Sequence, residues 1–140
     1  YKENEKTFES IEIPNMRGYL VNVSDVAAWE KFTGIAAYEH ELLTYATQKL
    51  QEIEGLRIYG ESKHKTAVIS FNIGDIHPYD IGTILDKLGV AVRTGHHCAQ
   101  PIMDFYKIPG TVRASFSFYN TKEEIDIFVN AVRKAKSMLG

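Results

Sequence analysis

Two stretches of the chain alternate between apolar and mainly polar residues, and this pattern limits the folds that are open to the chain. One stretch runs from 67 to 73 and the other from 112 to 118. A period of two places alternate side chains on one face of a β-strand, so each stretch is predicted to be a strand with one buried face. Helices must then cover that face. The apolar positions are Ala67, Ile69, Phe71 and Ile73, and then Val112, Ala114, Phe116 and Phe118.

Helical patterns precede these strands. Ser24 or Asp25 is predicted to cap a first helix, which Thr33-Gly34 is predicted to end. An apolar stripe at helical spacing predicts a second helix from about 35 to 53, with Gly55 as its stop. The stripe consists of Ile35, Tyr38, Leu42, Ala46, Leu50 and Ile53.

The middle of the chain continues the alternation of strands and helices. Residues 56–59 are predicted to be a short strand. Pro78 suits the first turn of a helix, and Gly89 suits its C-terminal stop. Val90, Ala91 and Val92 follow at once and are predicted to be a buried strand.

The end of the chain predicts a final helix. Thr121 with Glu124 forms a capping box. The apolar side of this helix consists of Ile125, Phe128, Val129, Val132 and Leu139. Together the elements predict a two-layer α+β domain, a small and mainly antiparallel sheet covered by helices. The charged residues 1–12 are expected to be a tail or truncated linker, and residues 13–140 to be one domain.

The only cysteine, Cys98, lies in the segment Arg93-Thr94-Gly95-His96-His97-Cys98-Ala99-Gln100-Pro101. A thiol acts as a nucleophile only when it is ionised, and neighbouring cations lower its pKa. Arg93, His96 and His97 all lie within five residues of Cys98. A lone cysteine is commonly an inert residue of the core, but these neighbours make a poor core environment. The segment therefore predicts a reactive thiol on a loop.

The Cys98 segment carries a resemblance to a known family, together with Arg113-Ala114-Ser115 and Tyr119-Asn120-Thr121. It resembles the C-terminal part of the SufS/CsdA branch, or group II, of cysteine desulfurases. These are pyridoxal 5'-phosphate (PLP) enzymes of the class V aminotransferases. The similarity covers almost the whole chain from about Ile13. It implies that residues 13–140 are the small C-terminal domain of a fold-type I PLP enzyme, and that the large PLP-binding domain lies outside this chain.

The resemblance also implies a role for each candidate residue. Cys98 matches the nucleophile that takes sulfur from L-cysteine as a persulfide and leaves L-alanine. Arg113 matches the arginine that binds the substrate carboxylate, and Arg93 matches one that holds the geometry of the site. For both arginines, a surface position on a strand is the competing interpretation. His96 or His97 is implied to shape the loop or to move a proton, and the sequence does not say which.

Two further patterns suggest a metal site and a cofactor lysine, but neither is predicted. His96, His97 and Cys98 are adjacent, and three adjacent residues rarely converge on one tetrahedral ion, so no metal site is predicted. Ser62-Lys63-His64-Lys65 matches the Ser-x-His-Lys pattern of the cofactor lysine but lacks its glycine-rich continuation. Its position between two strands predicts a charged surface turn. No cofactor-binding residue is therefore predicted here, and the chain alone is expected to be inactive.

Composition and resemblance together set the expected partners. The formal net charge is −2, with acidic and basic residues interspersed, which predicts no nucleic-acid surface. No apolar run approaches the roughly 20 residues that cross a bilayer, and one cysteine fits a reducing, cytoplasmic compartment. The resemblance implies L-cysteine as substrate, a SufE- or SufU-like sulfur acceptor, iron–sulfur cluster assembly as destination, and a homodimeric full-length protein.

Three alternatives remain beside this hypothesis. A stand-alone domain without the cofactor lysine would relay persulfide or dock a sulfur acceptor. The same site would also support selenocysteine lyase activity in the full-length protein. A class V transaminase is a weaker alternative because it has no need of Cys98.

Overall fold

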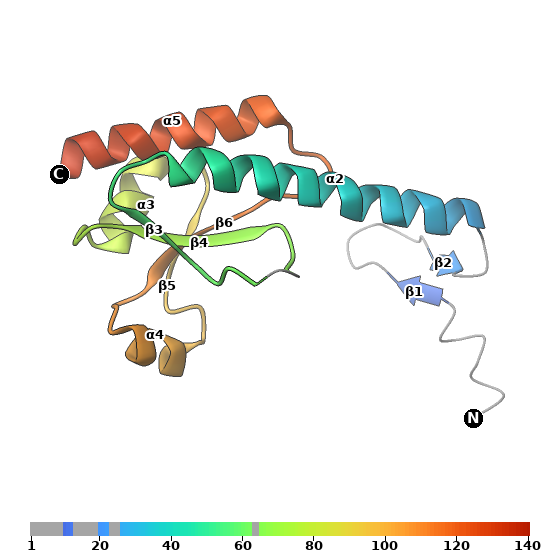
Figure 1. The fold of residues 1–140 in the computed structure, drawn as a ribbon, viewed down its shortest axis with the longest axis horizontal. Helices are drawn as coiled ribbons and strands as arrows, with labels where there is room; N and C mark the ends of the chain where they lie inside the picture. The colour runs from blue at the N-terminus through green and yellow to red at the C-terminus, as the bar shows by residue number, and fades with distance from the viewer. Residues whose placement is uncertain (1–9, 13–19, 23–25, 63–64) are drawn as a thin grey trace. The chain divides into compact units, whose positions relative to one another are not determined.

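The computed structural model describes residues 10–12, 20–22, 26–62 and 65–140, with side chains from residue 34 onward. The chain divides into two units, residues 1–38 and residues 39–140. In the first unit, strand β1 (Ser10–Glu12) pairs antiparallel with strand β2 (Leu20–Asn22) (Figure 1). Strand β1 falls within the segment that was expected to be a tail or linker.

Helix α2 (Val26–Gln51) is continuous through Thr33-Gly34, so the predicted break there was wrong. A glycine inside a helix costs only about 1 kcal/mol relative to alanine. The apolar stripe that follows outweighs this cost, because Leu42, Ala46 and Leu50 are completely buried. The predicted caps Ser24 and Asp25 lie outside the described residues.

The second unit contains a four-stranded sheet in the order β3-β4-β6-β5, with every neighbouring pair antiparallel. Its strands are β3 (Leu56–Tyr59), β4 (Val68–Ile73), β5 (Arg93–Gly95) and β6 (Thr111–Ser115). Strands β4 and β6 occupy the centre of the sheet. The predicted alternation is confirmed within them, because Ile69, Phe71 and Val112 have no exposed surface.

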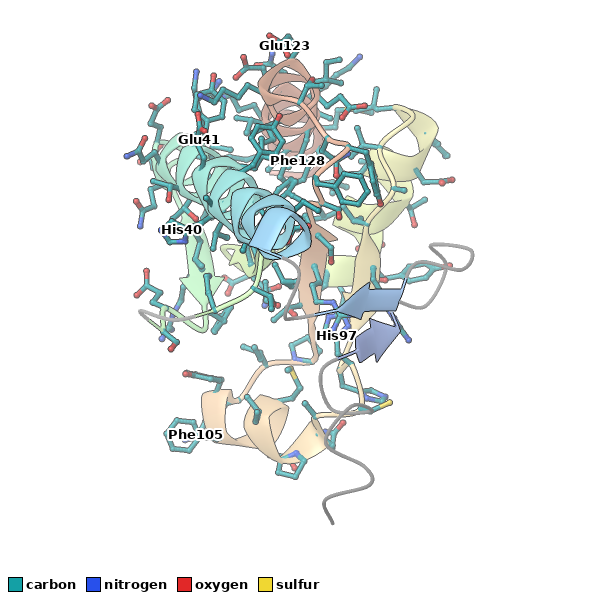
Figure 2. All side chains as sticks on the ribbon, turned by 90° about the vertical axis from the view of Figure 1, so that its right-hand side faces the viewer. His40, Glu41, His97, Phe105, Glu123 and Phe128 are labelled. Atoms are coloured by element: carbon teal, nitrogen blue, oxygen red, sulfur yellow. The ribbon has the colours of Figure 1, made fainter. Side chains whose placement is uncertain are left out.

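Helices cover the apolar face of this sheet. Helix α3 (Pro78–Lys87), helix α5 (Lys122–Leu139) and the part of α2 from Glu39 onward lie on this side (Figure 2). The capping box at the start of α5 is confirmed: Glu124 N donates to Thr121 Oγ1 at 3.3 Å, and Thr121 N donates to Glu124 Oε2 at 3.0 Å. The apolar stripe of α5 is buried except for Leu139 at the end of the helix. The predicted α+β class is confirmed.

Two of the predicted strands have other boundaries. Val90, Ala91 and Val92 form no strand and are not buried; Val90 N donates instead to Leu85 O at 2.9 Å, at the end of α3. Strand β6 stops at Ser115, so the prediction through Phe118 was wrong. Phe116 N still donates to Ala67 O at 2.8 Å, and beyond it Glu39 Oε1 accepts hydrogen bonds from Ser117 Oγ at 2.8 Å and Phe118 N at 3.2 Å.

Helix α4 (Gln100–Tyr106) was not predicted. Pro101 lies in its first turn, where proline is favoured, and this was the signal in the sequence. The helix lies over the other face of the sheet, because the Tyr106 ring meets the Tyr59 ring edge-on at 5.2 Å between centroids. None of the helices in the described ranges is long and apolar enough to span a membrane.

Candidate active site

Cys98 lies at the tip of a tight turn that follows edge strand β5. Ala99 N donates to His96 O at 2.8 Å, which closes the turn. Its two central residues, His97 and Cys98, have φ angles of 52° and 59°. Residues other than glycine are disfavoured in this left-handed region of φ and ψ. The turn therefore needs stabilising contacts with the rest of the chain. The Cys98 side chain is exposed, as a thiol that meets a reaction partner must be.

The imidazole of His97 supplies a contact between this turn and the sheet. Its Nε2 lies 3.2 Å from the carbonyl oxygen of Thr111 and 3.1 Å from Thr111 Oγ1. Thr111 begins β6 and is 1% exposed. Because Thr111 belongs to a central strand, its position is fixed by the sheet. In Figure 2, His97 lies between the sheet and α4, while Phe105 projects outward from α4.

Two glycines allow the backbone segments at the base of the Cys98 loop to approach each other closely. A Cβ on Gly110 would lie 2.8 Å from the backbone carbonyl of Gly95, which is closer than real Cβ contacts. Asn72, 6% exposed, donates from Nδ2 to Gly110 O at 2.9 Å. Residues 96–109 therefore leave and rejoin the sheet at one fixed point.

Gly110→Ala is expected to lower the free energy of unfolding of the chain by about 1–3 kcal/mol, because the new methyl group forces two backbone segments apart. Gly34→Ala is the matched control. Gly34 lies in α2 with open space where the methyl group of an alanine would lie, so alanine there is expected to stabilise by up to about 1 kcal/mol. Urea unfolding, monitored by circular dichroism, measures the stability of both variants. Equal stabilities of Gly110→Ala and the unchanged chain would contradict the close approach of Gly110 to Gly95.

The open face of the sheet carries two arginines beside the loop. Arg113 on β6 lies opposite Arg93 on β5 and opposite Ser70 on β4 in the strand register. Directly paired residues of neighbouring strands share a face, so both positive charges lie on the same face, an unfavourable pairing of like charges that a bound anion would relieve. In the part of the chain that the structure describes, neither arginine belongs to an ion pair. The pair is suited to a carboxylate or another anion.

A cavity of about 360 Å³ joins this face to α4. Of the predicted site residues, His97 and Arg113 line it. Cys98 is next to His97 in the turn, and Arg93 is paired with Arg113 in the strand register. His96 is exposed. Sequence reasoning missed Tyr59, Ser70 and Thr111, which line the cavity, and Asn72, which bonds to Gly110 at the base of the loop. For Ser70 and Asn72 the signal was the second face of the alternating stretch 67–73.

The environment of the cavity disfavours a charged His97. Burial is the main cause that lowers the pKa of His97 below its usual range, and the positive charges of Arg113, Arg93 and His96 act in the same direction. The hydrogen bond with the backbone of Thr111 acts against them. His97 therefore tends to be neutral in the folded chain.

The residues that line the cavity beside Cys98 do not form a binding site for pyridoxal phosphate. The cofactor needs a lysine amine for covalent attachment, and no described residue lining the cavity is a lysine. In the Ser62-Lys63-His64-Lys65 segment, Lys63 and His64 lie outside the described residues. Lys65 Nζ donates to Gly60 O at 3.1 Å, across the turn between β3 and β4. The residues that line the cavity thus suit an anion beside the Cys98 thiol rather than the cofactor. The described ranges also contain no group of three metal-ligating side chains.

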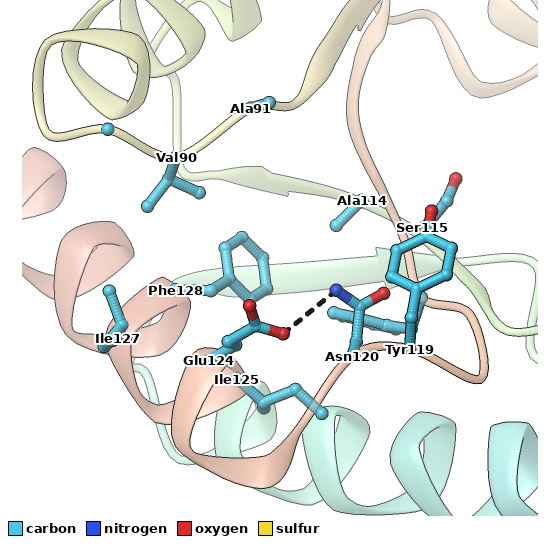
Figure 3. Close-up of a pocket in the computed structure, with 12 residues that line it drawn as sticks. Val90, Ala91, Ala114, Ser115, Tyr119, Asn120, Glu124, Ile125, Ile127 and Phe128 are labelled. Atoms are coloured by element: carbon cyan, nitrogen blue, oxygen red, sulfur yellow. Dashed lines mark hydrogen bonds between the residues drawn. The ribbon is translucent and has the colours of Figure 1, made fainter.

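A second cavity, of about 410 Å³, lies between residues 89–91, the end of β6 and the start of α5 (Figure 3). Its polar groups pair with each other, since Asn120 Nδ2 donates to Glu124 Oε2 at 3.1 Å. This bond and the one from Thr121 N lower the pKa of Glu124. None of the predicted site residues lines this cavity, so it is separate from the candidate site.

The chain is similar to known proteins in sequence. The model of the family "Aminotransferase class-V" matches residues 1–128. A probable cysteine desulfurase of Halalkalibacterium halodurans is 48% identical over 106 residues, which cover 76% of this chain and 26% of that protein. A cysteine desulfurase of Serratia proteamaculans is 45% identical over 106 residues, with the same two coverages.

Solved structures give the same result. The cysteine desulfurase CsdA of Escherichia coli, in an S-sulfonic acid form, has a TM-score of 0.69 at 34% identity. The match covers 75% of this chain and 26% of that one. The apo cysteine desulfurase of Thermococcus onnurineus has a TM-score of 0.70 at 32% identity, covering 94% of this chain and 38% of that one.

The chain therefore belongs to the aminotransferase class-V family, whose full-length members are implied to use pyridoxal phosphate. Within that family it is homologous to the cysteine desulfurases, including CsdA, and the predicted resemblance is confirmed. The chain spans about a quarter of the length of the curated relatives it matches.

Proposed function

We propose that this chain is the small C-terminal domain of a PLP-dependent cysteine desulfurase, with Cys98 as its sulfur acceptor. The observation that carries the proposal is an exposed thiol on a supported left-handed turn, beside two arginines that have no anionic partner among the described residues. The arginine pair suits the carboxylate of L-cysteine. The thiol then meets the sulfur atom of the same small substrate.

The proposed step is attack of the Cys98 thiolate on the sulfur of L-cysteine. A new S–S bond forms on Cys98 as the substrate C–S bond breaks, and the electron pair of that bond stays on carbon, which takes up a proton. The products are L-alanine and a persulfide on Cys98. Pyridoxal phosphate, held by the remaining part of the longer protein, supplies the electron sink that makes this C–S bond breakable.

Several features of the longer protein belong to the same proposal. An exposed thiol suits transfer of the sulfur to an acceptor protein of the SufE or SufU type, and from there to iron–sulfur cluster assembly. The proposal includes a homodimer and a cytoplasmic location, where the Cys98 thiol is kept reduced before it accepts sulfur. Comparing the turnover of L-cysteine and L-selenocysteine separates desulfurase from selenocysteine lyase activity.

The test is mass spectrometry of the longer protein after incubation with pyridoxal phosphate and L-cysteine. The peptide that contains Cys98 is expected to gain the mass of one sulfur atom, with one L-alanine formed per persulfide. Formation of a keto acid without added sulfur would overturn the proposal and indicate a transaminase. A 140-residue chain that accepts sulfur from a persulfide donor, in a protein that never forms alanine, would indicate a relay domain.

A further inference from the structure

We propose that His97 is a positioning residue which, as a neutral imidazole with its proton on Nε2, holds the Cys98 turn against Thr111. His96 has no such role. The inference rests on the proposed function only in giving Cys98 its purpose, because every contact used lies within the chain itself. The sequence left the two histidines equivalent, and the structure separates them: His97 is half-buried against the sheet and His96 is exposed.

The contacts of His97 assign the position of the proton. Nε2 lies 3.2 Å from the carbonyl oxygen of Thr111, an atom that only accepts hydrogen bonds, so Nε2 carries the hydrogen. Nδ1 is buried and has no hydrogen-bond partner within the described ranges. A second proton on Nδ1 would create a buried donor without an acceptor, together with a positive charge. The geometry thus favours the neutral ring.

The turn depends on this contact because its backbone is disfavoured. His97 and Cys98 both have left-handed φ angles, and the turn itself contributes one hydrogen bond, from Ala99 N to His96 O. The imidazole ties the first of these residues to Thr111 in the sheet. Without that contact, we expect the turn to relax to an ordinary backbone conformation and Cys98 to change direction.

The groups that face His97 oppose its protonation from each neighbouring element. Arg93 is on β5, Arg113 is on β6, and His96 precedes it in the loop. The other titratable groups of the cavity are Tyr59 on β3 and Tyr106 on α4, and no described residue lining the cavity is a carboxylate. No acidic group there would offset a second proton.

The stabilisation that His97 provides is therefore expected to weaken in acid. The pKa of His97 is lower in the folded chain than in the unfolded chain, so the unfolded chain binds more protons. The contribution of His97 to stability is complete above the ordinary histidine pKa of about 6.5 and falls as the pH drops below it.

Nitrogen NMR of the imidazole rings in the unchanged 140-residue chain tests the proposal directly. Across about pH 5 to 8, His97 is expected to be the Nε2–H tautomer and to titrate below the ordinary histidine pKa of about 6.5. A proton on Nδ1 of neutral His97, or titration of His97 at or above that ordinary value, would overturn the proposal.

Amide hydrogen exchange of Ala99 reports the turn itself, because this N–H closes it. His97→Ala is expected to speed Ala99 exchange about tenfold relative to Ile102, whose amide donates to Ala99 O in the first turn of α4. His97→Gln restores a side-chain N–H donor and is expected to restore the protection. His96→Ala is the matched control and leaves exchange unchanged. Unchanged protection in His97→Ala, or an equal loss in His96→Ala, would overturn the proposal.

These measurements are independent of any reaction. If the protein proves not to be a desulfurase, the tautomer of His97 and the protection of Ala99 still test the turn. If His97→Ala fails to fold, the tautomer in the unchanged chain and the protection in His97→Gln still decide the proposal.

Discussion

Cys98→Ser in the longer protein is expected to reduce sulfur transfer from L-cysteine by at least about 1,000-fold, because a hydroxyl cannot accept sulfur as the thiolate does. The variant keeps nearly the same size at an exposed position, so the fold is expected to persist. Substrate binding is also expected to persist, since Arg113 and Arg93 remain on the sheet. The measurements are the rate of alanine formation with a sulfur acceptor present, and substrate affinity by calorimetry.

Ser137→Ala, an exposed position on α5 away from the loop, is the control and is expected to retain full activity. Sulfur transfer by Cys98→Ser at an undiminished rate would contradict the proposed function. Loss of transfer together with loss of substrate binding would show that the substitution acts through the structure of the site rather than through the nucleophile.

Phe71→Ala is expected to lower the free energy of unfolding of the chain by about 3–5 kcal/mol. Phe71 has no exposed surface, lies on central strand β4, and meets Phe128 of α5 edge-on with 6.1 Å between ring centroids. Removing its ring leaves a cavity between the sheet and its covering helices. Because a domain is stable by only about 5–15 kcal/mol, this loss is a large part of the whole. Urea unfolding measures it.

Phe105→Ala is the matched control, since it removes the same ring from a side chain that is 79% exposed on α4. Its expected effect is within about 0.5 kcal/mol. Equal losses in the two variants would contradict the assignment of Phe71 to the core. A smaller loss in Phe71→Leu than in Phe71→Ala is expected as well, because leucine fills part of the cavity.

The elements that the sequence predicted well are those whose pattern reflects burial. The alternation of residues 67–73 identified β4, and the capping box at Thr121 identified the start of α5. Two strand predictions failed where another group takes the backbone amide hydrogen. Glu39 takes that of Phe118, and Leu85 at the end of α3 takes that of Val90. Glu39 is remote from Phe118 in sequence and leaves no local pattern, whereas Leu85 is close to Val90 and continues the helix end.

The candidate site divides along the same line. Cys98 was predicted from its residue type and neighbours, and Arg113 from the family resemblance. Ser70 and Asn72 were missed as parts of the site, although both sit on the polar side of a predicted strand. Their importance depends on the pairing of β4 with β6, one of its two neighbouring strands.

Local chemistry in the sequence thus determined the class of fold and the capping box of α5, and it singled out Cys98 as the candidate thiol, because periodicity and residue type act over short distances. Tertiary structure alone decided that His97 contacts Thr111 while His96 remains exposed. It also decided that Gly110 meets Gly95, and that Arg93 faces Arg113. The physical reason is that strand register and loop closure depend on the packing of the whole sheet, and a one-residue shift of β5 along β6 would no longer place Arg93 opposite Arg113.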